Sequence, residues 1–129
     1  ACDAYAETLS EAILNLISVF IAETDFDPRL DFSVRGWAAQ SADVMARVAS
    51  ADERRIAAIK ALFVHFGFAR EEADVRAHAV YLVQIGYISL QVAEDTATRV
   101  NRASEYVRIY TGRTPSEREL ARFRARHEC

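Results

Sequence analysis

Three histidines are the first side chains to consider for chemistry, because imidazole is a common metal ligand and a common general base. They are His65, His78 and His127, and they lie in three different segments of the chain. None has a cysteine, a second histidine or a carboxylate at a spacing typical of zinc sites, such as His-Glu-x-x-His. The histidines therefore predict no metal site.

The acidic residues do not predict a catalytic pair either. Glu71, Glu72 and Asp74 gather where a helix is expected to begin, and there they favour the helix by interacting with its dipole. The charged run at residues 52–55 predicts weak ion pairs on a solvated helix surface. Common nucleophile and nucleotide-binding motifs, such as Gly-x-Ser-x-Gly, are missing from the sequence. We therefore predict that the chain is not an enzyme and uses no cofactor.

The composition favours one helical domain that has no nucleic-acid-binding surface of its own. Of the 129 residues, 51% are hydrophobic and 27% are charged, while only four are glycine and two are proline. This length fits a single domain, residues 1–129. The chain has a formal net charge of −3, so it does not have the excess of Lys and Arg that phosphate binding requires.

Cysteine usage and hydropathy indicate where the protein works. Cys2 and Cys129 lie at the two ends of the sequence, so they predict no disulfide framework. The longest apolar stretch, residues 12–22, is too short to span a membrane. We therefore expect a cytoplasmic protein without a membrane partner.

Apolar residues recur at the helical period along most of the chain and predict an all-α fold of five to six helices. We expect Thr8 and Glu11 to form a capping box at the first helix, and we allow a kink at Ser50 in the third. The expected ranges are 5–23, 27–40, 41–67, 71–93 and 96–110, followed by a short last helix.

Helix starts are marked by side chains that cap free backbone amides. Asp27 followed by Pro28 predicts the start of the second helix, because proline is tolerated in the first turn. Thr114, Pro115 and Glu117 predict a second capping box, with Thr114 as the capping residue of the last helix.

Aromatic and polarizable side chains gather on the second to fourth predicted helices and suit an apolar small-molecule cavity. The single tryptophan falls on the apolar face of its helix and is expected in the core. Such a set more often simply fills an ordinary core, and the sequence leaves both interpretations open. The candidate pocket residues are Trp37, Met45, Phe63, His65, Phe66, Tyr81 and Tyr87.

Two rows of residues, one on the fourth and one on the fifth predicted helix, predict that these helices pair with a second subunit. Ala79, Gly86 and Ala93 recur every seven residues and would let another helix approach closely, and the fifth predicted helix carries a regular apolar seam. Two helices from each subunit would then form an intersubunit four-helix bundle. The alternative, an internal core, stays open. The candidate interface residues are Ala79, Val83, Gly86, Leu90, Ala93, Val100, Ala103, Val107 and Tyr110.

A pattern of spaced residues over 27–90 carries a family resemblance. It comprises Asp27-Pro28-Arg29-Leu30-Asp31, Arg35-Gly36-Trp37-Ala38, Val48, Asp52-Glu53-Arg54-Arg55, Leu62-Phe63, Gly67-Phe68, Glu72-Ala73 and Ala77. Together these residues resemble the C-terminal domain of TetR-family transcriptional regulators. The resemblance implies a homodimer built through the fourth and fifth helices, with a pocket for a small-molecule inducer.

In that family an N-terminal helix-turn-helix recognises operator DNA. Its signature is missing here, since residues 62–66 mimic only its end and fall within a continuous predicted helix. We expect the DNA-binding module upstream of residue 1, so that operator DNA is a partner only through that module. The expected function is a regulatory domain that binds an apolar or amphipathic inducer and controls DNA binding. The alternative is a helical protein–protein interaction module with no small-molecule ligand.

Overall fold

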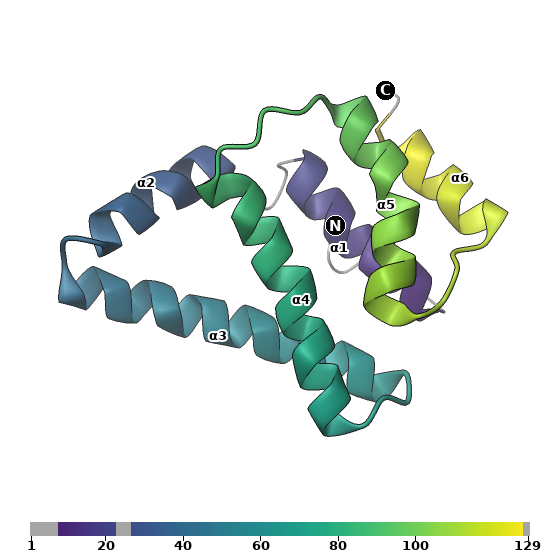
Figure 1. Ribbon diagram of the computed structural model, residues 1–129, viewed down its shortest axis with the longest axis horizontal. Helices are drawn as coiled ribbons and strands as arrows, with labels where there is room; N and C mark the ends of the chain where they lie inside the picture. Colours follow the sequence, from purple (N-terminus) through teal and green to yellow (C-terminus); the bar gives the residue numbers. More distant parts are fainter. Residues whose placement is uncertain (1–7, 23–26, 128–129) are drawn as a thin grey trace. The chain divides into compact units, whose positions relative to one another are not determined.

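The computed structural model describes residues 8–22 and 27–127, which form six helices and no strand (Figure 1). The predicted all-α class is therefore confirmed. Residues 5–7 and 23 of the first predicted helix lie outside the described residues. The helices are α1 (Leu9–Ala22), α2 (Pro28–Ala38), α3 (Ala42–His65), α4 (Arg70–Ser89), α5 (Thr96–Thr111) and α6 (Glu117–Ala125).

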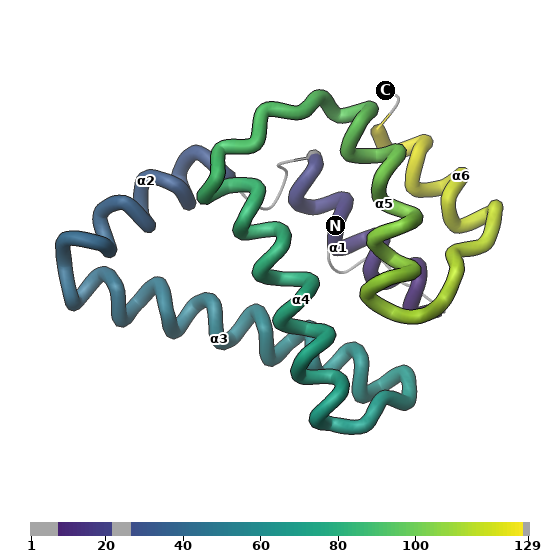
Figure 2. Tube along the Cα trace, viewed as in Figure 1, coloured from purple at the N-terminus to yellow at the C-terminus, as the bar shows by residue number. Residues whose placement is uncertain are grey.

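The helices form two compact units, and each is described by itself. One unit contains α2, α3 and α4, which follow each other within residues 27–92. The other contains α1, α5 and α6, so it joins helices from opposite ends of the sequence (Figure 2). None of the described helices is long and apolar enough to cross a membrane.

The core of the α2–α4 unit lies chiefly between α3 and α4. Ile59 and Phe63 are buried on α3, and the small residues Ala73 and Ala77 are fully buried on α4, where they allow close helix packing. The rings of Phe63 and Phe68 pack edge to face, with their centroids 5.4 Å apart. The α3 helix continues without interruption through Ser50.

The ends of these helices follow ordinary capping chemistry. The Asp27 carboxylate accepts hydrogen bonds from the backbone amides of Arg29 and Leu30, at 3.0 and 3.2 Å, which confirms the predicted start of α2. Gly67 has a φ of 101° just after α3, a left-handed conformation that glycine adopts without strain.

The α4 helix is shorter than predicted at its C-terminal end. It ends at Ser89, and Gln91 then takes a φ of 50°, which turns the chain away from the helix. Ala93 therefore lies beyond α4, and its predicted place on the seven-residue stripe is wrong.

The α1 helix is the central element of the second unit. Leu9, Ile13, Leu14 and Ile17 are all buried, because α5 and α6 both pack against this helix. Phe123 supplies the buried aromatic side chain of α6. A helix with apolar residues on most of its surface needs neighbours on several sides.

The last helix begins two residues later than predicted. Its capping residue is Ser116, whose hydroxyl accepts from the Glu119 amide at 3.1 Å, and the Glu119 carboxylate accepts from the Ser116 amide at 3.1 Å. The predicted capping box of Thr114 and Glu117 is therefore wrong. Both pairs have the same spacing, but Glu119 also accepts a hydrogen bond from the hydroxyl of Thr8, the residue just before α1.

A ladder of polar contacts joins α1 to α6 and to the residues just after it. The partners rise together in sequence number, so the two helices run in the same direction. Three of the pairs are separated by 111 residues. The ladder consists of Thr8–Glu119 (2.5 Å), Glu11–Arg122 (2.7 Å), Asn15–Arg126 and Ser18–His127 (2.8 Å).

Candidate functional site

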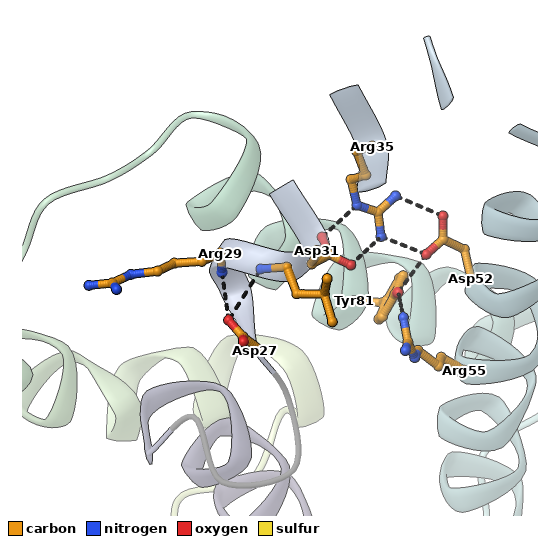
Figure 3. Close-up of polar contacts among 8 residues, drawn as sticks. Asp27, Arg29, Asp31, Arg35, Asp52, Arg55 and Tyr81 are labelled. Atoms are coloured by element: carbon orange, nitrogen blue, oxygen red, sulfur yellow. Dashed lines mark hydrogen bonds and ion pairs between the residues drawn. The ribbon is translucent and has the colours of Figure 1, made fainter. Parts of the chain in front are cut away.

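A polar network connects all three helices of the α2–α4 unit, and Arg35 of α2 lies at its centre (Figure 3). The Arg35 guanidinium donates to Asp31 on its own helix through Nε at 2.7 Å. It also donates to both carboxylate oxygens of Asp52 on α3, through Nη1 at 2.9 Å and Nη2 at 2.7 Å. Two parallel hydrogen bonds between a guanidinium and a carboxylate fix the relative orientation of the two groups as well as the distance between them.

Tyr81 extends the network to α4. Its hydroxyl donates to Oδ1 of Asp52 at 2.6 Å and accepts from Nη1 of Arg55 at 3.1 Å. Tyr81 is only 2% exposed, so its ring belongs to the core while its hydroxyl completes the polar contacts. Asp52 therefore receives donors from α2 and α4 at the same time.

The network fixes the charges of its members. Burial opposes ionisation of Asp52, but the hydrogen bonds from Arg35 and Tyr81 outweigh it and hold the pKa of this carboxyl below its usual value. The hydrogen bond to Asp52 raises the pKa of Arg35 despite partial burial. Burial and the Asp52 carboxylate raise the pKa of the Tyr81 phenol. At neutral pH the carboxylate is ionised and the phenol is protonated.

These charge states favour a positioning role for the network. A group that exchanges protons efficiently has a pKa near the working pH, and both Asp52 and Tyr81 are shifted away from neutrality. Among the described residues, no group of three or more His, Cys, Asp and Glu side chains is arranged to hold a metal ion.

The sequence did not reveal this network. We expected Asp52 and Arg55 on a solvated helix surface, but Asp52 is about one-quarter exposed and is bonded to two other helices. That part of the expectation is wrong. The available signal was the spacing of Asp31 and Arg35, which lie one helical turn apart beside apolar residues. Spacing alone does not identify a partner on another helix.

The predicted pocket residues occupy different environments. Phe63 and Tyr81 are buried, Phe66 and Tyr87 are partly buried, and His65 is exposed with its ring 5.0 Å from that of Phe66. Two further candidates lie on the surface, since Trp37 is 63% exposed and Met45 is 50% exposed. The predicted core position of Trp37 is therefore wrong.

The predicted interface residues on α5 are covered within the chain. Ala103, Val107 and Tyr110 are buried, and α5 packs against α1. Val100 is partly buried. The regular seam on α5 therefore belongs to the internal core of its own unit, which was the alternative left open for this stripe.

The predicted interface residues on α4 lie on the opposite side of that helix from its buried residues. We call this surface the outward α4 face, and it combines exposed or partly exposed apolar residues at helical spacing. A methyl group placed on Gly86 would have no described neighbour within 4 Å beyond the backbone of its own helix. The outward α4 face comprises Val75, Ala79, Leu82, Val83, Gly86 and Leu90.

Comparison of the chain with protein-family models, with curated proteins and with solved structures gives no match. The network and the outward α4 face are therefore interpreted from their own chemistry.

Proposed function

We propose that the chain is a dimerising regulatory domain, of the kind found in TetR-like transcriptional regulators. The outward α4 face carries this proposal. Val75, Leu82 and Leu90 are 68%, 57% and 79% exposed, and all three lie on this one face. Large apolar side chains that share an exposed stripe are typical of an interaction surface.

The energetics favour covering this face. Burying one such side chain is worth roughly 1.5–3 kcal/mol relative to leaving it in water, before the cost of association is subtracted. Gly86 costs the helix about 0.5–1 kcal/mol relative to alanine. No close neighbour among the described residues requires a glycine there. A helix from outside the chain that approaches closely at Gly86 would account for it.

A second copy of the chain suits this face because the face carries no charged residue. In a two-fold dimer the same surface meets itself, so a charge close to the two-fold axis would oppose a like charge. The six side chains that define the face are uncharged and avoid that repulsion.

The regulatory part of the proposal is supported by the spaced residues of 27–90. Asp31, Arg35, Asp52 and Arg55 belong to the pattern that resembles the TetR-like domain, and the structure brings them together in one network. In the proposed function an apolar or amphipathic inducer binds one conformation of the domain and shifts its population. Operator DNA would be bound by a helix-turn-helix module outside this chain.

The test compares Leu82→Glu with the control Ile109→Glu by sedimentation velocity at micromolar concentration. Leu82 and Ile109 are similarly exposed, at 57% and 64%, but Ile109 lies on α5. We expect the wild type and Ile109→Glu to be dimers and Leu82→Glu to be a monomer with unchanged helical circular dichroism. A monomeric wild type, or a Leu82→Glu variant that still dimerises, would contradict the proposal.

A second candidate function is a protein-interaction module, and α2 supplies the observation that favours it. Leu30 and Trp37 lie two turns apart on α2 and are both more than 60% exposed. An apolar helix face of this kind is typical of helices that dock into a groove of another protein. Trp37 is the only tryptophan, so its fluorescence reports on this face. If the chain is a monomer and its Trp37 emission does not change with protein concentration, then the α2 face does not pair with a second copy. That result would favour the second candidate.

A further inference from the structure

The α2 helix contacts α3 and α4, but few of its apolar side chains are buried. Within residues 28–38, all of which the structure describes, Ala38 alone is buried. Leu30 and Trp37 are mostly exposed, and Val34 is partly exposed. Most helices in globular proteins are held by a buried apolar stripe, and α2 lacks a complete one.

The other two helices of the unit are held differently. Ile59 and Phe63 of α3 are buried together with Ala73, Ala77 and Val80 of α4. Apolar contacts of this kind do not depend on any single polar pair. The packing of α3 on α4 can therefore persist without α2.

The Arg35 network joins α2 to α3 through side-chain hydrogen bonds. Three nitrogen atoms of one guanidinium connect Asp31 of α2 with Asp52 of α3, and the Tyr81 hydroxyl of α4 donates to Oδ1 of Asp52, which also accepts from Arg35. The Arg35 and Asp52 side chains are 21% and 23% exposed. An ion pair at such a position gains charge attraction but also loses hydration, so its net contribution is modest.

We infer that α2 is a separately releasable arm. In its docked position the Arg35 network holds it against α3 and α4. In its released position the arm pivots about residues 39–41, between α2 and α3, while α3 and α4 stay packed. The arm carries Leu30 and Trp37 with it, so its release changes where the exposed apolar side chains of α2 are presented. Local opening of this kind requires less free energy than global unfolding.

Native-state hydrogen exchange of the full chain, read helix by helix, tests the arm. In the wild type we expect the amides of α2 to exchange at least tenfold faster than those buried between α3 and α4. In Arg35→Gln we expect a further acceleration of about tenfold or more in α2, with α3 and α4 unchanged. The matched control is Arg47→Gln, because Arg47 forms an exposed ion pair with Asp43 on α3 at 3.6 Å.

Two results would overturn the inference. One is a wild type in which α2 exchanges only together with α3 and α4, as a single cooperative unit. The other is an Arg35→Gln variant that loosens α3 and α4 as much as α2. If Arg35→Gln fails to fold, the wild-type exchange rates still decide, and Asp52→Asn provides a milder change that keeps a hydrogen-bond acceptor on α3.

Discussion

The Tyr81 hydroxyl joins one donor and one acceptor from α3, so its removal measures the polar part of the network alone. In Tyr81→Phe the aromatic ring stays in the core, Asp52 loses one donor and keeps Arg35, and Arg55 remains able to reach solvent. We expect the free energy of unfolding to fall by about 1.5–3 kcal/mol, the range for a hydrogen bond to a charged group. Urea unfolding measures this loss.

A double-mutant cycle with Asp52→Ala, which removes the acceptor, identifies the origin of that loss. If the Tyr81 hydroxyl acts through Asp52, the two substitutions together cost less than the sum of the single ones. Fully additive losses would show that Tyr81 acts through other contacts.

The depressed pKa of Asp52 also gives the network a pH dependence of known sign. A carboxyl with a lower pKa in the folded state contributes stability above its unfolded pKa of about 4, and this contribution is lost as the pH falls through the folded pKa. Urea unfolding between pH 7 and pH 3 should therefore show declining stability below about pH 4. The decline should be smaller in Asp52→Asn, and an equal decline would exclude Asp52 as a source.

Asp27 acts on neighbouring backbone and could be predicted from the sequence, whereas Asp52 acts across helices and could not. Asp27 caps the helix that immediately follows it, so its role depends on neighbours in the sequence. Asp52 is bonded to Arg35, 17 residues earlier, and to Tyr81, 29 residues later. The sequence around Asp52 resembles an ordinary charged helix surface.

At the scale of the helices, the start of α6 can be tested by two neighbouring substitutions. Ser116→Ala removes the hydroxyl that accepts from the Glu119 amide, so we expect a loss of about 1 kcal/mol. Thr114→Ala is the matched control and should change stability by less than about 0.5 kcal/mol, because Thr114 is exposed and precedes the helix. Thermal or urea unfolding distinguishes the two, and a larger loss at Thr114 would contradict the observed cap.

The existence of each helix could be predicted because its apolar residues repeat at the helical period, but helix ends and partners depend on tertiary contacts. The α5 seam of Ala103, Val107 and Tyr110 was predicted correctly as a packing surface, yet its periodicity fits α1 as well as a second subunit. The end of α4 depends on the backbone at Gln91, which no glycine or proline marks. A repeat that includes Ala93 therefore looked continuous in the sequence.

At the scale of the whole molecule, polar residues of the first helix indicate that it packs against other helices, although the period of its apolar residues does not. Thr8, Glu11, Asn15 and Ser18 form a polar line at three- and four-residue spacing along an otherwise apolar helix. Such a line needs polar partners when its helix is buried. The partners lie about 110 residues away, and the sequence does not identify them.

The α1–α6 ladder has a consequence for the order in which the protein folds during synthesis. The ribosome completes α1 long before it adds the helices that cover it, whereas α2, α3 and α4 follow each other and close locally. Contacts between distant segments form late because they require closure of a long loop. The apolar surface of α1 therefore stays accessible to chaperones, or to aggregation, until α5 and α6 emerge. Pulse-labelling hydrogen exchange during refolding should show protection of α3 and α4 before α1, and simultaneous protection would contradict this order.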